Sequence, residues 1–412
     1  MANSVLDVLG IGLGPFNISL NCLLAKTGLD SLFIDKNKEF SWHPYCMGGN
    51  LQVSWLKDCV SAIDPTNFYS FLNYVSKNGL FYQFAARKCD VITRLEYNDY
   101  LRWILSHFKN IHFNSNAQRL RVSDKGYYIV ETDKDIYTAK SIVVGTGCVP
   151  NIPNFAKKYI GDEVFHSSVY MKHRKQINGR ILIVGNGQSA CEIVMDLLDN
   201  APDVDIIWIS NASTFHSLDD NAIINSLYSP SYTKEIIKTE ENYKKILFNN
   251  LLYTSDGISS LTANQLFESI YNKKKEICLS LDTSLCNLNK SDAGYNANIF
   301  LKKFNKYKNL IIDKVILCTG YNQSIPDFLV ESDLIDIACD KLLNNDFSCK
   351  IKANTKGKIY IQNLSRNAIG PIDSNLSIMP YRNAVIINSI LKSNFYSGLD
   401  SERFVFSKLK AS

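Results

Sequence analysis

The chain has 412 residues, more than one compact domain usually holds, so two or three domains are expected. The formal net charge of +5 is small for this length and the lysines are dispersed, so no nucleic-acid partner is expected. No apolar run approaches the roughly 20 residues of a membrane helix and the N-terminus shows no leader, which predicts a cytoplasmic protein without a membrane partner. Eleven cysteines without a Cys-x-x-Cys pair indicate reduced thiols and argue against a metal or dithiol site.

The first motif in the chain is a glycine-rich turn between a strand and a helix. An apolar strand over residues 5–9 precedes the turn, and residues 17–26 have the apolar spacing of a helix. The turn contains Gly10, Gly12, Gly14 and Pro15. A second strand over residues 31–34 ends at Asp35, where a carboxylate would bind the ribose of an adenosine nucleotide. This order predicts a dinucleotide site, with a purely structural turn as the alternative.

A second unit of the same kind lies near the middle of the chain. Strands are expected over residues 181–184 and 204–209, with a helix over residues 191–198 between them. The turn before that helix contains Gly185, Gly187, Gln188, Ser189 and Ala190. Ser210 and Asn211 follow the second strand, where the first unit has its acid. Because a carboxylate would repel the 2′-phosphate of NADP, its absence favours NADPH, although no Arg stands there to bind that phosphate.

Two nucleotide units predict two redox nucleotides, and a flavin with a nicotinamide is the natural pair. Residues 141–147 and 315–321 each resemble a strand that runs into Thr-Gly, as at the domain crossings of flavoproteins with two dinucleotides. We therefore expect an α/β fold with two Rossmann-like dinucleotide-binding domains, a discontinuous FAD domain and a small helical substrate-binding region. The expected bounds are 1–155 and 313–412 for the FAD domain, 156–213 and 280–312 for the NADPH domain, and 214–279 for the helical region, with helical spacing continuing toward residue 300.

Several shorter motifs occur in one order along the chain. They are residues 10–17, 40–44, 51–58, 64–66, 71–74, 97–103, 165–170, 185–190, 219–220 with 225, 255–258, 318–321 and 373–382. Together they resemble the siderophore-pathway N-hydroxylating flavin monooxygenases, which oxidise the terminal amine of lysine, ornithine or related diamines. The resemblance runs nearly from end to end, and it implies an NADPH-dependent flavin N-monooxygenase.

The resemblance also implies a reaction and its participants. NADPH would reduce FAD, the reduced flavin would bind O2 as a C4a-hydroperoxide, and a neutral primary amine would attack the distal oxygen. The substrate would be lysine, cadaverine, putrescine or a histamine-like amine, and the product would serve siderophore hydroxamate or related biosynthesis. Because an ammonium has no lone pair, the pocket must favour the deprotonated amine. Members of the family are commonly dimers or tetramers, so a homo-oligomer is implied.

The resemblance assigns roles to single residues. Gln52 beside the flavin ring and Ser377 near the reacting amine would be the catalytic residues. Lys57, Asn225 and Leu376 would bind the substrate, unless Lys57 is a surface lysine and Asn225 a helix N-cap. No metal ligand is expected. The cofactors would contact Gly10, Gly12, Gly14, Pro15, Asp35, Trp42, His43, Gln52, Gly185, Gly187, Gln188, Ser189, Ala190, Thr319, Gly320 and Tyr321.

Departures from the family pattern leave the substrate open. Ile369 stands where many members have His, and a substrate without a carboxylate would leave Lys57 without its partner. Arg366 and Arg382 are expected to be structural ion-pair partners. The alternatives to an amine hydroxylase are a flavin monooxygenase of another substrate class, such as a sulfide or a ketone, and a non-catalytic flavin-binding sensor.

Overall fold

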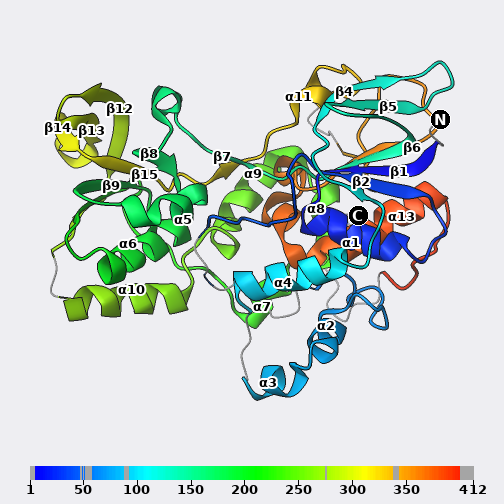
Figure 1. Cartoon of the computed structure of the whole chain (residues 1–412), viewed down its shortest axis with the longest axis horizontal. Helices are drawn as coiled ribbons and strands as arrows, with labels where there is room; N and C mark the ends of the chain where they lie inside the picture. The colour runs from blue at the N-terminus through cyan, green and yellow to red at the C-terminus, as the bar shows by residue number, and fades with distance from the viewer. Residues whose placement is uncertain are drawn as a thin grey trace.

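The computed structural model shows two α/β bodies side by side, joined by long crossing segments (Figure 1). It describes residues 5–46, 49, 51, 58–87, 92–273, 276–336 and 343–399, and all structural statements concern these residues. None of the helices in this part of the chain is long and apolar enough to cross a lipid bilayer.

The first body is built on a seven-stranded sheet that joins both ends of the chain. Its order is β3-β2-β1-β6-β5-β4, and β17 also pairs with β6. Since β17 comes from the last third of the chain and lies parallel to β6, this domain is discontinuous, as predicted. The strands are β1 (Leu6–Ile11), β2 (Ser31–Ile34), β3 (Ile111–His112), β4 (Ala117–Val122), β5 (Tyr128–Thr132), β6 (Ile136–Val144) and β17 (Ile359–Ile361).

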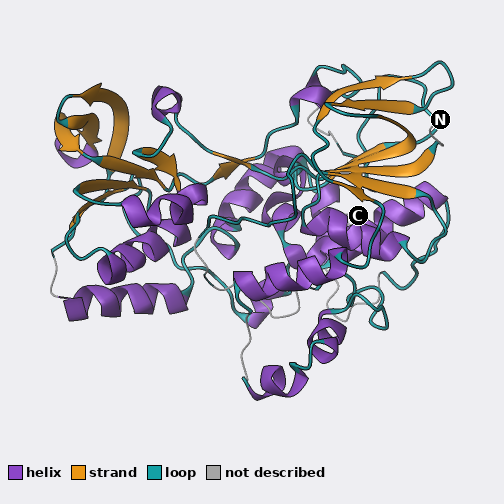
Figure 2. Ribbon diagram, viewed as in Figure 1, coloured by secondary structure: helices purple, strands orange, loops and turns teal. Residues whose placement is uncertain are grey.

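Helices cover one face of this sheet and bury its core (Figure 2). All ten residues of α1 (Pro15–Leu24) are buried, and α1 packs against α13 (Met379–Leu391) and α4 (Arg94–Leu105). The helix begins two residues before the predicted start, with Pro15 in its first turn. Proline suits that position because its fixed φ fits the helix and its missing N–H needs no partner there, which accounts for Pro15 after the turn.

The second body is built on a five-stranded parallel sheet of order β11-β10-β9-β15-β8. One face is covered by α6 (Gln188–Asn200) and α10 (Ser260–Lys273), which pack together. A three-stranded antiparallel sheet packs on the other face and shares a buried cluster with it. The strands of the two sheets are β8 (Val164–His166), β9 (Arg180–Val184), β10 (Asp205–Ile209), β11 (Cys278–Ser280), β15 (Lys314–Leu317), β12 (Thr283–Ser291), β13 (Gly294–Leu301) and β14 (Lys306–Ile312).

Two predicted boundaries need correction. The strand β15 pairs with β8 and β9 in the second sheet, so the return to the FAD domain begins after residue 317 and not at 313. The expectation of helices toward residue 300 is wrong beyond residue 273, because residues 278–301 form β11, β12 and β13.

The predicted helical region 214–279 does not form a unit of its own. Residues of α8 (Pro230–Lys238) and α9 (Glu241–Asn250) pack on the core of the first body, whereas α10 packs on α6 of the second. Its apolar faces are thus shared between the two domains. The remaining helices are α2 (Phe71–Lys77), α3 (Phe81–Ala86), α5 (Tyr170–His173), α7 (Ala222–Asn225), α11 (Asp327–Val330) and α12 (Arg366–Ile369).

Candidate functional site

The first glycine turn leads from β1 into α1 and leaves the start of the helix open. Gly12 has a φ of 87°, and a Cβ there would lie 2.5 Å from the carbonyl oxygen of Gly145. Gly14 is the N-cap of α1 and has no side chain to satisfy the first N–H groups of the helix. The N–H of Leu13 donates to Oδ2 of Asp35 at 2.8 Å, which fixes the carboxylate beside the turn. An anionic ligand is favoured at such a helix start.

The second turn repeats this geometry between β9 and α6. Gly185 has a φ of 120°, and a Cβ there would collide with the carbonyl oxygen of Cys318. Gly187 is the N-cap of α6, again without a side-chain hydrogen bond, and the first turn of α6 contains no acid. The two helix starts therefore offer two sites for pyrophosphate groups, which fits the predicted pair of dinucleotides.

The two crossing segments lie side by side as a short antiparallel pair, β7 (Val149–Pro150) and β16 (Tyr321–Asn322). His166 holds β16 to the end of β8. Its Nδ1 accepts the N–H of Ser168 at 3.1 Å, and its Nε2 lies 2.9 Å from the carbonyl oxygen of Gly320. Nδ1 is thus the acceptor and Nε2 the donor, while burial lowers the pKa of the ring. These bonds make His166 a neutral structural link between the domains.

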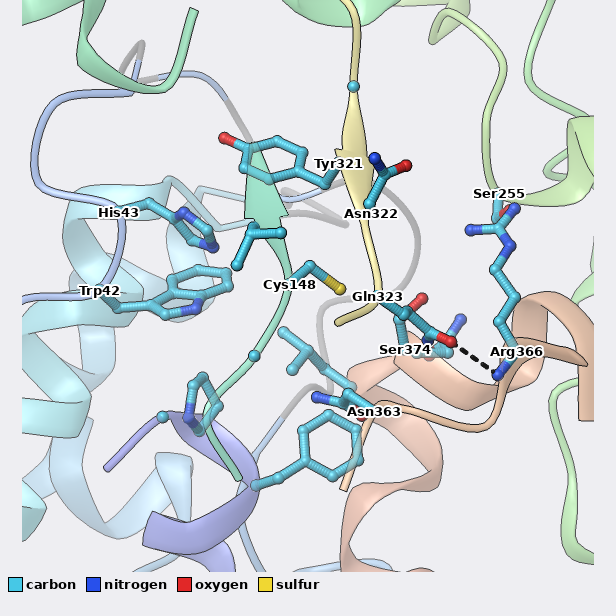
Figure 3. Close-up of a pocket in the computed structure, with 18 of the residues that line it drawn as sticks. Trp42, His43, Cys148, Ser255, Tyr321, Asn322, Gln323, Asn363, Arg366 and Ser374 are labelled. Carbon is cyan, nitrogen blue, oxygen red and sulfur yellow. Dashed lines mark hydrogen bonds between the residues drawn. The ribbon is translucent and has the colours of Figure 1, made fainter. Parts of the chain in front are cut away.

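A cavity of about 1450 Å³ extends from the first turn to the second. Small-molecule pockets usually measure roughly 300 to 1,000 Å³, so this cavity has room for more than one ligand. Figure 3 shows its central part, with Trp42 and His43 on one side and Gln323, Asn363 and Arg366 on the other. Its lining includes Leu13, Gly14, Pro15, Phe16, Asp35, Trp42, His43, Leu51, Arg94, Cys148, Gly187, Gln188, Ser189, Ser255, Asp256, Thr319, Gly320, Tyr321, Gln323, Asn363, Arg366 and Leu376.

The wall formed by Trp42 and His43 is uncharged. The two rings meet edge to face at 4.8 Å between centroids, and the main-chain N–H of Trp42 donates to Asn98. His43 faces the cavity, yet enough protein surrounds its ring that burial lowers its pKa to about 4, with the positive charge of Arg94 as the second cause. The imidazole is therefore neutral at pH 7 and adds no charge to the cavity wall.

The opposite wall is held by a chain of polar contacts. Gln323 accepts the main-chain N–H of Arg366 at 2.9 Å and donates to Oδ2 of Asp373 at 2.7 Å. Behind it, Arg382 and Asp373 form an ion pair at 3.0 Å, with their side chains 1% and 0% exposed. At the rim, the Arg366 guanidinium pairs with the carboxylate of Asp256. Both arginines are thus ion-pair partners, as predicted.

The buried pair positions the loop that carries the cavity residues at the C-terminal wall. The Arg382 guanidinium lies 5.1 Å from the ring of Phe16 and 4.9 Å from that of Phe347, and it donates to the main-chain oxygen of Asp373. Burial lowers the pKa of Arg382, and the charge of Asp373 opposes this shift. Because an unpaired charge in such a place is costly, the pair holds Asp373 and the segment around it against α13.

The structure brings most of the predicted cofactor residues to the cavity. Those that line it are Gly14, Pro15, Asp35, Trp42, His43, Gly187, Gln188, Ser189, Thr319, Gly320 and Tyr321. Four others are not among its lining residues and shape the turns from behind: Gly10, Gly12, Gly185 and Ala190. The Gln188 amide is engaged within the protein, because it donates to Glu192 and Thr262 and accepts from Ser259.

The predicted substrate and catalytic residues are placed less uniformly. Leu376 lines the cavity, and Ser377 follows it in the same short helical turn without being among the described lining residues. Gln52 and Lys57 lie outside the described residues. Asn225 ends α7, so the N-cap alternative is wrong: the cap is Asn221. Nδ2 of Asn225 donates to the main-chain oxygen of Asp220, and its buried Oδ1 has no hydrogen-bond partner within the described chain.

Several cavity residues were not predicted from the sequence. Arg94, Cys148, Gln323 and Asn363 come from four separate segments and belong to no local motif. The Cys148 thiol opens to the cavity, but burial of its surroundings raises its pKa, so it stays protonated at neutral pH. Asn363 has a φ of 61°, a conformation that Asn tolerates better than most residues, and only this preference could have marked it.

Comparisons with known proteins find relatives along nearly the whole chain. Residues 4–323 match the family described as L-lysine 6-monooxygenase/L-ornithine 5-monooxygenase. The L-lysine N6-monooxygenase of Escherichia coli is 30% identical over 406 residues, which cover 95% of each chain. The putrescine N-hydroxylase of Acinetobacter baumannii is 31% identical over 410 residues, which cover 95% of this chain and 91% of the hydroxylase.

Solved structures share the arrangement of the two domains. The FAD-bound cadaverine monooxygenase DfoA of Erwinia amylovora, from the desferrioxamine biosynthetic pathway, matches with a TM-score of 0.89 and 25% identity. That match covers 100% of this chain and 99% of DfoA. The ornithine hydroxylase PvdA of Pseudomonas aeruginosa matches with a TM-score of 0.86 and 28% identity over 94% of this chain and 99% of PvdA.

Proposed function

The chain belongs to the L-lysine 6-monooxygenase/L-ornithine 5-monooxygenase family, and we propose that it hydroxylates the terminal amino group of a small primary amine with FAD, NADPH and O2. The observation that carries this proposal is one cavity lined by both glycine turns. Residues 13–16 reach it from the first turn and residues 187–189 from the second. A flavin and a nicotinamide held at these turns would meet in the same cavity.

Each nucleotide has a set of residues that fits it. The FAD pyrophosphate would lie at the start of α1, with Asp35 beside its adenosine ribose, and the NADPH pyrophosphate at the start of α6. Bound FAD, once reduced by NADPH, would activate O2, and the amine would receive one oxygen atom of that O2 while the other leaves as water. The protein would position the amine next to the flavin and exclude water from the reaction.

The cavity walls would also keep the amine in its reactive form. Phe40, Trp42, Leu51 and Leu376 give the lining an apolar part, and the neutral His43 lies among them. Such surroundings disfavour an ammonium, so they lower the pKa of a bound amine and expose its lone pair. The reacting amino group would therefore lie toward these apolar residues.

The rim offers both signs of charge for the other end of the substrate. The ion pair of Asp256 and Arg366 lies at the cavity edge, with the two side chains 41% and 36% exposed. A carboxylate there suits a second ammonium, and a guanidinium suits a carboxylate. This favours lysine, cadaverine, putrescine or a histamine-like amine, the first three being substrates that the names of the relatives contain. The hydroxylated amine would enter siderophore hydroxamate biosynthesis.

The proposal is tested by measuring hydroxylamine formation by the FAD-loaded protein with NADPH and O2. The panel is lysine, ornithine, cadaverine, putrescine and histamine, with peroxide release followed in parallel. Product from one amine in proportion to NADPH consumed is the expected result. NADPH consumption that yields only peroxide with every amine would count against an amine hydroxylase.

The same assay separates amino acids from diamines through Lys57. If this lysine binds a substrate carboxylate, Lys57→Ala should raise the KM for lysine by the equivalent of about 1.5 to 3 kcal/mol, the usual loss for a hydrogen bond to a charged group. The KM for cadaverine should hardly change, because cadaverine has no carboxylate. Equal effects on both amines would rule out this role.

A further inference from the structure

The loop after β10 lies directly beside the second glycine turn. Gly185 donates its N–H to the oxygen of Ile209, the last residue of β10, at 2.8 Å. Asn186 in the turn donates from its side chain to the main-chain oxygen of Thr214 at 2.7 Å. Residues 210–213 are thus held between two contacts to the turn, at the place where proteins of this fold distinguish the ribose hydroxyl of NADH from the 2′-phosphate of NADPH.

A lysine from a distant segment reaches this loop. Lys302 begins the short helical turn between β13 and β14, and its Nζ lies 2.6 Å from the main-chain oxygen of Asn211, a residue 91 positions earlier. The main-chain N–H of Lys302 donates to the oxygen of Asp282 at 2.9 Å, which fixes this turn against the end of β11. An ammonium has three N–H donors, and the Asn211 oxygen takes one of them.

The charges around this loop sum to a positive value. Lys303 follows Lys302 and lies 3.7 Å from the carboxylate of Asp282. The same carboxylate accepts a hydrogen bond from the Ser213 hydroxyl at 2.6 Å, and only 16% of its side chain is exposed, against 65% for Lys303. The loop region therefore has two lysines and one carboxylate, which Ser213 and Lys303 engage, and both lysines are exposed.

We propose that Lys302 and Lys303 bind the 2′-phosphate of NADPH at the loop of residues 210–213. This inference rests on the proposed use of NADPH. The first unit has a carboxylate at the equivalent strand end, whereas residues 210–213 contain none. The Lys302 ammonium contacts this loop, and Lys303 lies beside Asp282, whose carboxylate already accepts from Ser213. A lysine binds phosphate as a point charge, so it can replace the arginine that is missing at this strand end. The tertiary fold thus supplies a phosphate site that the local motif lacks.

The test is calorimetric titration of the FAD-loaded protein with 2′,5′-ADP and, separately, with ADP, which lacks the 2′-phosphate. The parent should bind 2′,5′-ADP more tightly than ADP. Lys302→Ala should weaken 2′,5′-ADP about tenfold, as expected for the loss of one charge-assisted bond, and the double variant with Lys303→Ala should weaken it further. Binding of ADP should stay unchanged. The matched control is Lys308→Ala, an exposed lysine on β14 of the same small sheet.

Two results would overturn the inference. One is an unchanged affinity for 2′,5′-ADP in the double variant, and the other is an equal loss for ADP and 2′,5′-ADP, which would indicate damage to the whole site. Flavin absorbance and hydroxylamine formation at high NADPH are measured separately. A parent protein that binds 2′,5′-ADP through these lysines but hydroxylates no amine would count against the proposed reaction and not against the phosphate site.

Discussion

The glycine turns of the two nucleotide units have the same backbone geometry. Gly12 donates its N–H to the end of β2 and Gly185 to the end of β10, both at 2.8 Å. Each glycine has a positive φ and faces the carbonyl of the residue that leaves the neighbouring central strand, Gly145 or Cys318. Contacts with the ends of the neighbouring strands therefore fix each turn. The nucleotide site is preformed in the protein without its ligand.

The units differ in how they obtain charge at the end of their second strand. In the first, Asp35 directly follows the strand and is held by the N–H groups of Leu13 and Asn37. In the second, the uncharged Ser210 lies at that place, and the charge comes from Lys302, which the sheet of β12 to β14 brings to the next residue, Asn211. A local motif therefore describes the first unit completely, whereas the selectivity of the second depends on tertiary structure.

The largest effect is expected at the fully buried ion pair of Arg382 and Asp373 in the first domain. Asp373→Asn would leave the fully buried Arg382 without its counter-charge, which typically costs about 3 to 5 kcal/mol. The loop of residues 370–376 should lose its place at the cavity, and flavin should be lost with it. The thermal midpoint and the ratio of flavin to protein absorbance report the two effects.

The matched control lies in the second unit. Arg174 and Asp196 also form an ion pair, at 2.7 Å, but the Arg174 side chain is 31% exposed. Water can solvate Arg174 after Asp196→Asn, and the Asn oxygen can still accept the hydrogen bond of the Tyr170 hydroxyl, so the loss should be only about 1 to 2 kcal/mol and the flavin content should not change. If both variants lost the same stability, burial would not be what distinguishes the two pairs.

The next largest effect is expected at the first turn. Gly12→Ala would place a methyl group 2.5 Å from the Gly145 oxygen at a φ of 87°, which should cost about 2 to 3 kcal/mol and expel FAD. Gly28→Ala is the control, because Gly28 also has a positive φ, at 73°, while no described atom lies within 4 Å of the added Cβ. It should lose only about 1 kcal/mol and keep its flavin. Full flavin occupancy in Gly12→Ala would show that the crowded turn is not needed.

Whether a feature of this structure can be predicted from the sequence depends on how far apart in the chain the interacting residues lie. The strands, turns and helices of both units were predicted to within a few residues, because each depends on neighbours in the chain. The strands of residues 283–301 were missed, although Tyr295, Ala297 and Ile299 alternate as buried positions of β13 and could have indicated a strand. The cavity residues Gln323 and Arg366 could not have been paired, since only the packing of distant segments brings them together.

A smaller effect is expected at Gly187, the counterpart of Gly14 in the second unit. Its φ of −83° suits any residue, and no described atom lies within 4 Å of an added Cβ. Gly187→Ala should therefore fold normally and keep its flavin, while the methyl group occupies the space of the NADPH pyrophosphate. The Kd for NADPH, measured by titration, should rise about tenfold, equivalent to roughly 1.4 kcal/mol. A fall in thermal midpoint like that of Gly12→Ala would mean that Gly187 is needed for folding and not only for contact with the nucleotide.

The smallest effect tests the charge difference at the strand ends directly. Asn211→Asp gives the second unit an acid one residue beyond the position that Asp35 has in the first, on the exposed part of the loop that Lys302 contacts. Lys302 contacts the main-chain oxygen of residue 211, so that contact survives the substitution. At an exposed site, one added negative charge near a phosphate should cost about 0.7 kcal/mol, which is roughly a threefold weaker affinity for NADPH. Affinity for NADH should rise, because the new carboxylate can accept from both ribose hydroxyls.

The neutral variant Asn211→Ser separates charge from shape in this last experiment. It should leave the ratio of the two Kd values near that of the parent, and the loss in Asn211→Asp should shrink as salt is raised, since exposed charges are screened. A shift that is equal in both variants, or that is independent of salt, would mean that the side chain of residue 211 acts by its shape. The selectivity would then not follow from the sign of the charge at the strand end, and the contrast between Asp35 and Lys302 would lose its physical basis.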